Sequence, residues 1–276
     1  TVRPDFAWRN IQGSAYTFRK TSKKMLLWKL RLGCHWKKSI TVHGIDYVIH
    51  HENTRRSHPE WYRLAGGKRE TVARGGKPCL SSRDLLKSHV AFVRAYFDIY
   101  DAKMCNVMPT DGYVSVCQCP LCQGKGTPER GYRGRLSDYV WGYANRVAAK
   151  VYKTHPDKLV SCGSYSAYRE PPLKIEKLSP NMVVRAKRNL GGLTRASRNP
   201  ELWQKALAQL RMWGDVIPSE KPVRVATNYS AAGSKGLPLY APRLIARYVR
   251  SVADICESGL ITSHPTNTGD VRGGTI

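Results

Sequence analysis

The chain has 276 residues, 41% of them hydrophobic, and its 46 Lys and Arg against 20 Asp and Glu give a net charge of +26. This composition provides enough apolar residues for a large core, and no run reaches the roughly 18 consecutive apolar residues that a membrane-spanning helix needs. A charge this basic favours polyanions, nucleic acid first and an acidic polysaccharide second, although a host whose proteins are all basic would explain it as well.

The basic residues are spread along the whole chain instead of forming one tail. Dispersed charge of this kind argues against a dedicated nucleic-acid-binding arm. The sequence starts at Thr1 without an initiator Met or a signal segment. We therefore expect a fragment of a longer protein or a processed chain, with residues 1–276 forming a single domain.

Apolar periodicity predicts strands that alternate with helices along most of the chain. The predicted strands cover residues 5–11, 45–51, 104–109, 158–165, 181–187, 222–229 and 260–265. The predicted helices cover residues 15–32, 81–100, 135–156, 199–216 and 240–259. Ser82 and Asn199 are the expected N-caps of two of these helices, and residues 63–78, rich in Gly and charge, are expected to form a flexible loop.

This alternation indicates parallel strands joined by right-handed crossovers. Seven such units in 276 residues predict an α/β fold of the (β/α)₈ TIM-barrel type that lacks its first strand and its closing helix. An open doubly wound sheet is the alternative. It is weakened because no Gly-rich phosphate-binding loop follows the first predicted strand.

Function in such a barrel gathers where strands end on their C-terminal side. The residues predicted there are polar, aromatic or basic, a composition that suits a sugar with its hydroxyl groups and ring faces. They are Arg9, His50, His51, Asp111, Tyr165, Tyr168, Asn228 and His264.

Asp111 is the candidate general acid. It follows the strand predicted at 104–109, and the preceding Met108 and Pro109 suggest that it lies beside apolar surface. Burial there would raise the pKa of its carboxyl group and keep it protonated, as a general acid requires. The alternative is a simple turn, because Asp is favoured before a glycine such as Gly112.

His50 and His51 end the strand predicted at 45–51, so alternation would point one of them inward. An inward histidine here is more typical of substrate binding or a core hydrogen bond than of metal ligation, and we expect no catalytic metal. Tyr165 and Tyr168 follow another strand, ahead of Pro171 and Pro172. These tyrosines could form a stacking platform or an ordinary aromatic loop.

Three cysteines stand in the spacing C-x-C-x-x-C, at Cys117, Cys119 and Cys122. A structural zinc site normally has four ligands, and Cys79 is the candidate for the fourth. Zinc, disulfides and free thiols remain equal alternatives, and in each case the cluster would brace the loop that carries Asp111.

Several short motifs keep one order along the chain: HPEWYRLAGGKR, CLSSRDLL, TDG followed by CQCPLC, HPDKLVSCGSYSAYREPP and NMVVR. Together they resemble a bacterial family of unknown function found in exported carbohydrate-metabolism proteins, which is similar to the barrel domains of α-glucuronidases and β-hexosaminidases. The resemblance extends from about residue 6 to residue 265 and is densest between residues 58 and 187.

The resemblance implies a glycoside-hydrolase-like barrel in which Asp111 is the acid. It likewise assigns the family's histidine-rich third strand to His50 and His51, and its tyrosine-rich fifth strand exit to Tyr165 and Tyr168. The chain departs from the family pattern near the last two strands, where Asn228 and His264 stand in place of acidic residues.

Most glycosidases need two carboxylates, and Asp111 supplies only one. Glu52 and Glu170 are the nearest substitutes on predicted strand-end loops. We therefore predict an exported glycosidase acting on a poly- or oligosaccharide that contains an acidic or amino sugar, with its second carboxylate unidentified. A non-catalytic carbohydrate-binding barrel is the first alternative, and a basic nucleic-acid-binding protein, supported by charge alone, is the second.

Overall fold

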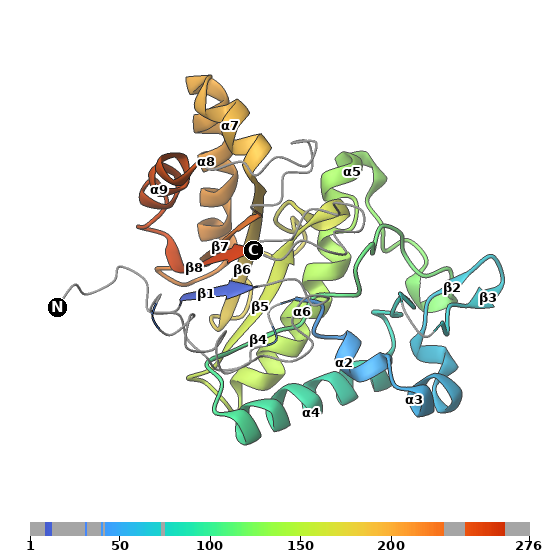
Figure 1. Ribbon diagram of the computed structural model, residues 1–276. Helices are drawn as coiled ribbons and strands as arrows, with labels where there is room; N and C mark the ends of the chain where they lie inside the picture. Colours follow the sequence, from blue (N-terminus) through green and yellow to red (C-terminus); the bar gives the residue numbers. More distant parts are fainter. Residues whose placement is uncertain are drawn as a thin grey trace, which may run out of the picture. The chain divides into compact units, whose positions relative to one another are not determined.

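The structure is a computed structural model of the chain (Figure 1), and it describes residues 9–12, 31, 40, 42–72, 75–228 and 241–262. The chain divides into two compact units. Unit 1 comprises residues 1–36, 186–211 and 223–276, and unit 2 comprises residues 37–185 and 212–222. Helix α8 and strand β6 each contribute residues to both units. The prediction of a single domain is not tested by this division and stays a prediction.

Unit 2 combines parallel strands with helices and one hairpin. Its elements include α2 (Asp46–Ile49), α3 (Glu52–Ser57), β2 (Leu64–Ala65), β3 (Lys68–Arg69), α4 (Arg83–Tyr100), β4 (Met104–Asn106), α5 (Gly131–Gly134), α6 (Ser137–Tyr152), β5 (Leu159–Ser164) and the start of β6 (Met182–Asn189). Strands β4 and β5 pair in parallel, and β6 follows β5 in the strand order. Strands β2 and β3 form a separate antiparallel hairpin.

Two long helices form the main packing layer of unit 2. Helices α4 and α6 lie side by side, α4 against β4 and α6 against β5 (Figure 1). Helix α4 buries one apolar face, which includes Leu85, Val90, Val93 and Phe97. Such an apolar stripe is what fixes an amphipathic helix on a sheet.

The ends of the long helices follow their sequence signals. The Ser82 hydroxyl caps α4 by accepting a hydrogen bond from the Leu85 amide at 3.2 Å. The Asn199 side chain accepts a 3.1 Å bond from the Leu202 amide at the start of α8 (Pro200–Val216). Both predicted caps are therefore confirmed.

Unit 1 contains the remaining strands and helices. They are β1 (Arg9–Gln12), the end of β6, α7 (Leu190–Ser197), the first part of α8, β7 (Val223–Asn228), α9 (Pro242–Arg250) and β8 (Cys256–Thr262). Strand β8 lies between β1 and β7 and is parallel to both. Helix α9 packs on α8, with Tyr248 edge-on to Trp203 at 6.3 Å between ring centroids.

The α/β class with a parallel sheet is confirmed. The barrel remains a prediction, because neither unit closes a ring by itself over its described residues: in unit 2 strand β4 pairs only with β5, and in unit 1 strand β1 pairs only with β8. The strands predicted at 104–109, 158–165, 181–187 and 222–229 are observed as β4, β5, β6 and β7.

The strand predicted at 45–51 is wrong, since these residues form α2 and the turn after it. Ile45 and Ile49, four residues apart, are fully buried, whereas Tyr47 is 46% exposed. This is helical and not alternating burial, and the run was too short to separate the two patterns. The contact with β4 is made just before it, where the Ile40 carbonyl accepts a bond from the Asn106 amide at 3.0 Å.

Three smaller predictions also differ from the structure. The helix predicted at 240–259 ends at Arg250, and the last strand starts at Cys256 instead of residue 260. The loop predicted at 63–78 contains the β2–β3 hairpin. The helix predicted at 15–32 lies outside the described residues except for residue 31.

Gly44 is required where the segment before α2 crosses β4. A Cβ atom at residue 44 would overlap the Asn106 carbonyl oxygen, which is backbone and cannot rotate away. We expect Gly44→Ala to lower the free energy of unfolding by about 2 kcal/mol or more. Gly214→Ala is the matched control because nothing lies within 4 Å of its added Cβ. Urea denaturation of both variants measures the difference, and equal stabilities would contradict this packing.

The buried His89 imidazole, which contacts the Tyr143 hydroxyl at 3.0 Å, should make stability sensitive to acid. Burial lowers its pKa from 6.5 to about 3. The unfolded chain therefore binds the proton first, and stability that is present above pH 6.5 is lost as the pH falls toward 3. The loss amounts to about 2 kcal/mol between pH 7 and pH 5.

Urea unfolding at both pH values should show this loss in the wild type. His89→Gln, which keeps a hydrogen-bonding partner for Tyr143, should lose about 2 kcal/mol less over the same interval. An identical pH dependence in His89→Gln would show that His89 is not the acid-sensitive group.

Candidate functional site

Polar side chains from four segments of unit 2 meet where β4 ends. We call this group the strand-end cluster. It consists of His43, Asp46, Lys77, Thr110, Asp111 and Tyr165. The residues come from the segment entering α2, the loop after β3, the loop after β4 and the end of β5. The C-terminal ends of neighbouring parallel strands meet at one edge of a sheet, which brings the loop after β4 and the end of β5 together.

Asp111 lies at the tip of the loop after β4. Its Oδ1 atom accepts a 2.9 Å bond from the Gly112 amide and lies 3.8 Å from His43 Nε2. The Lys77 ammonium group donates to its backbone carbonyl. The side chain is 71% exposed, so the burial that the sequence suggested is wrong. Met108 and Pro109 do not cover it, because the glycine turn carries the carboxylate away from the apolar end of the strand.

Asp46 brings a second carboxylate to the same loops. The buried Thr110 hydroxyl donates a 2.7 Å bond to Asp46 Oδ1, and Thr110 directly precedes Asp111 in the chain. His50, one helical turn after Asp46, places its Nε2 atom 3.7 Å from the same oxygen. One of the two predicted histidines is therefore attached to the cluster through Asp46.

The two predicted tyrosines differ in exposure. Tyr165 is half-buried, and burial, followed by the neighbouring Asp111 carboxylate, raises its pKa above the usual 10.0. Tyr168 is fully buried, and burial is the main cause that raises its pKa well above 10.0. Its ring cannot stack on a ligand, so a platform would consist of Tyr165 alone. The Tyr168 hydroxyl has no hydrogen-bond partner among the described residues.

Two residues of this region have left-handed backbone conformations. His43 has a φ of 46°, and Ser166, which follows Tyr165, has a φ of 51°. For residues other than glycine this conformation costs about 1–2 kcal/mol and must be held in place by its surroundings. The third such residue, Asp101, caps the C-terminus of α4 and has a structural explanation. Strained residues of this kind often cluster at functional sites.

The other predicted site residues are not joined to the cluster by any described contact. His51 is exposed, and its Nε2 contacts the Tyr47 carbonyl at 3.0 Å. Arg9 and Asn228 lie in β1 and β7, but their side chains are not described, and His264 lies outside the described residues. Their roles in binding stay predictions.

Neither predicted substitute for the second carboxylate is joined to Asp111 by a described contact. Glu52 is an exposed residue of α3 and pairs with Arg56. Glu170 is 43% exposed and lies 3.6 Å from Arg130.

Sequence reasoning missed His43, Asp46 and Lys77. Asp46 meets Thr110 across 64 residues, and His43 meets Asp111 across 68 residues. No local spacing encodes such pairs. The His43–Gly44 dipeptide before an acidic residue was the available signal, because a glycine that admits close backbone approach often marks a site.

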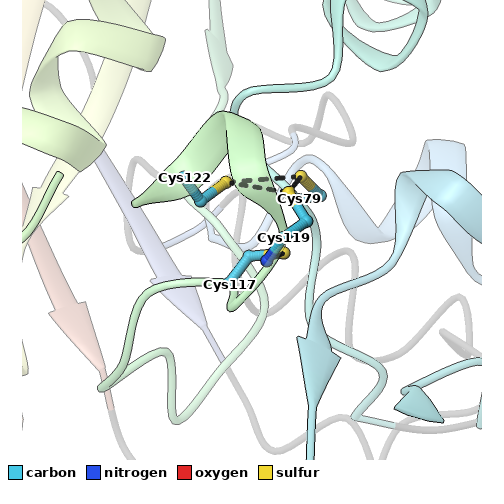
Figure 2. A group of neighbouring side chains, drawn as sticks. All are labelled: Cys79, Cys117, Cys119 and Cys122. Carbon is cyan, nitrogen blue, oxygen red and sulfur yellow. Dashed lines mark hydrogen bonds between the residues drawn. The ribbon is translucent and has the colours of Figure 1, made fainter. Parts of the chain in front are cut away.

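A second group in unit 2 consists of four buried cysteines. Figure 2 shows the sulfur atoms of Cys79, Cys117, Cys119 and Cys122 directed toward one another, all within 4.8 Å. A hydrogen bond from Cys79 lowers the pKa of the Cys122 thiol to about 4, and the same bond raises the pKa of the Cys79 thiol. The structure thus places Cys79, the candidate fourth ligand from the sequence, beside the three cysteines of the C-x-C-x-x-C segment.

A cavity of about 720 Å³ opens beside the cysteine group rather than at Asp111. It is lined by residues of the α4 N-terminus, the turn after Cys119 and helix α6, among them Arg83, Lys125 and Tyr139. None of the predicted substrate-binding residues lines it. In the part of the chain that the structure describes, no helix is long and apolar enough to cross a membrane.

Residues 1–225 match the family described as Domain of unknown function (DUF4838). The chain belongs to this family. No curated protein matches the DUF4838 chain at a significant level.

Two solved structures of endo-glycoceramidase II from Rhodococcus sp. are similar to the DUF4838 chain, one a lactosyl-enzyme intermediate and the other a five-membered iminocyclitol complex. Both have 11% sequence identity and cover 68% of this chain, with TM-scores of 0.37 and 0.38. The match covers 41% and 42% of the lengths of those two chains. The DUF4838 chain therefore spans about two fifths of the length of the structures it matches.

The contact between Tyr165 and Asp111 predicts a coupled titration. Because burial is the larger cause of the raised Tyr165 pKa and Asp111 the next, Asp111→Asn should lower that pKa without returning it to 10.0. The Cζ chemical shift of ¹³C-labelled tyrosine, assigned with Tyr165→Phe, measures the change. Asp157→Asn, on an equally exposed aspartate, should leave it unaltered. A Tyr165 pKa that is the same with and without Asp111 would contradict the contact.

Proposed function

We propose that the strand-end cluster of this chain hydrolyses glycosidic bonds. The observation that carries the proposal is the pair of carboxylates, Asp46 and Asp111, that the Thr110 hydroxyl and the His43 segment tie to one edge of the β4–β5 pair. Glycoside hydrolysis characteristically uses two carboxyl groups, one to protonate the leaving oxygen and one to act as nucleophile or base. The ordered motifs that resemble a glycoside-hydrolase-like family support the same reaction class.

In this proposal Asp111 is the general acid and Asp46 the second carboxylate. Asp111 is exposed at the loop tip, where a glycosidic oxygen can reach it. Asp46 is about three-quarters buried and accepts the Thr110 bond, which holds its carboxylate in a fixed orientation. Tyr165 supplies an aromatic face beside Asp111, and His43 orients the acid.

The substrate we propose is a poly- or oligosaccharide that contains an acidic or amino sugar. Lys77 donates to the backbone carbonyl of Asp111, so the proposed acid has a cationic neighbour that would favour an anionic sugar. The net charge of +26 would also attract an anionic polymer over a longer distance. The resemblance to exported proteins supports an exported enzyme.

One observation favours a second function, which is carbohydrate binding without cleavage. A general acid usually gains its proton affinity from burial or a neighbouring negative charge, and the Asp111 side chain is 71% exposed. A protein that only binds sugar would need Tyr165 and the cationic side chains but neither carboxylate. The first function predicts turnover that depends on Asp46 and Asp111, and the second predicts sugar binding without turnover.

The test is turnover of a panel of aryl glycosides of uronic acids and N-acetylhexosamines. If Asp111 is the acid, Asp111→Asn should lower kcat by about 10²–10⁴-fold for poor leaving groups. The loss should be much smaller for dinitrophenyl glycosides, which leave without protonation. Asp46→Asn should slow both kinds of substrate, and added azide should restore part of the activity of one of the two variants.

Asp157→Asn is the matched control, because that side chain is 72% exposed in the same unit, and it should retain full activity. An anionic substrate should also show a KM that rises with salt, while a neutral one should not. Sugar binding by calorimetry without any turnover would support the second function. Activity that survives both Asp111→Asn and Asp46→Asn would remove this cluster as the site of reaction.

A further inference from the structure

The four buried cysteines have the geometry of a closed metal site. Cys79 Sγ lies 3.7 Å from Cys119 Sγ and 3.6 Å from Cys122 Sγ, and the last two are 3.5 Å apart. Sulfur atoms about 2.3 Å from a central zinc ion in a tetrahedron lie about 3.8 Å from one another. We propose that Cys79, Cys117, Cys119 and Cys122 bind one structural zinc ion.

The surroundings of the sulfurs are suited to thiolates. Cys117 Sγ accepts bonds from the Leu64 amide at 3.2 Å and from the Cys119 amide at 3.5 Å, and the Arg69 guanidinium lies 3.9 Å away. The Tyr139 hydroxyl contacts Cys122 Sγ at 3.1 Å. Four thiolates around Zn²⁺ carry a net charge of −2, and these donors stabilise it in a buried place.

Disulfides do not fit this arrangement. A disulfide needs about 2.05 Å between its sulfur atoms, and the three closest pairs of the group are 3.5–3.7 Å apart. Each sulfur has several sulfur neighbours within 4.8 Å rather than one partner.

The other described cysteines show what ordinary buried thiols look like in this chain. Cys105, Cys162 and Cys256 are also buried, and they lie in three different strands, β4, β5 and β8. None of them belongs to a metal-ligand group among the described residues. Four cysteines that converge from two distant segments therefore require a cause beyond apolar burial, and a shared ion supplies one.

The zinc would hold together a part of unit 2 that has little regular structure. Its ligands come from the segment after the β2–β3 hairpin and from the loop after β4. Backbone bonds such as the one from the Gln118 amide to the Leu64 carbonyl, 2.9 Å, accompany this junction. With four protein ligands the ion has no open coordination position, so its role is structural and it takes no part in a reaction.

The first test uses the whole chain as purified, without added metal. We expect about one zinc per chain by elemental analysis. Replacing zinc with Co²⁺ should give the visible bands of a tetrahedral ion together with near-ultraviolet thiolate charge-transfer bands. Thiol titration in denaturant without reductant should find the four cysteines of the group as free thiols. Three results would each overturn the proposal: disulfides in place of thiols, a chain that contains no zinc, or a chain that contains iron in place of zinc.

Variants then locate the ion. Cys119→Ser and Cys122→Ser should each lose most of the bound zinc, whereas Cys162→Ser, a buried cysteine outside the group, should keep it. If the first two variants do not fold, zinc release from the wild type by a mercurial reagent replaces them. The release of each zinc ion should then accompany the modification of four thiols. Zinc release that does not follow thiol modification would contradict ligation by the cysteines.

Discussion

The hydroxyl group of Thr110 joins the three loops on which the rest of the strand-end cluster depends. It lies 2.7 Å from Asp46 Oδ1 and 3.2 Å from the Gly76 carbonyl oxygen, and it is buried. A buried hydroxyl that lost these acceptors would cost about 1–3 kcal/mol, so the loops are held to one arrangement. Gly76 must be glycine here, since a Cβ would approach the Glu70 carbonyl oxygen at 2.7 Å. The orientation of both carboxylates follows from this junction.

The cysteine group constrains the same loops from their other end. Two residues before Cys79, Lys77 donates to the Asp111 carbonyl, and the Tyr113 hydroxyl donates to the Pro78 carbonyl at 3.2 Å. The segment that supplies a sulfur ligand is therefore also the segment that contacts the Asp111 loop. In this part of unit 2, polar and sulfur contacts hold the loops in place. Helices α4 and α6, by contrast, are held in place by their packing against the strands.

The sequence was sufficient where information is local. Long helices with regular apolar spacing and a capping residue, such as α4 after Ser82, can be predicted, and so can strands bounded by them. It failed at residues 45–51, where one helical turn and a short strand have the same apolar content. It located Asp111 because a strand end can be predicted, but not its exposure, since that depends on how the Gly112 turn directs the side chain. Asp46 and His43 could not be found because their partners lie more than 60 residues away.

The exposure of Asp111 and its proposed role as an acid are compatible on physical grounds. Desolvation disfavours a charged carboxylate, and a sugar ring placed over Tyr165 would exclude water from the side of Asp111 that now faces solvent. The substrate would then create the environment that the free protein lacks, as happens when closing a site replaces water by fixed groups. His43 and Lys77, both beside the Asp111 loop, oppose that effect with positive charge when His43 is protonated. In this proposal, the balance between a sugar that removes water and cations that favour the carboxylate would decide between hydrolysis and binding alone. An anionic sugar would shift that balance toward hydrolysis by neutralising those cations.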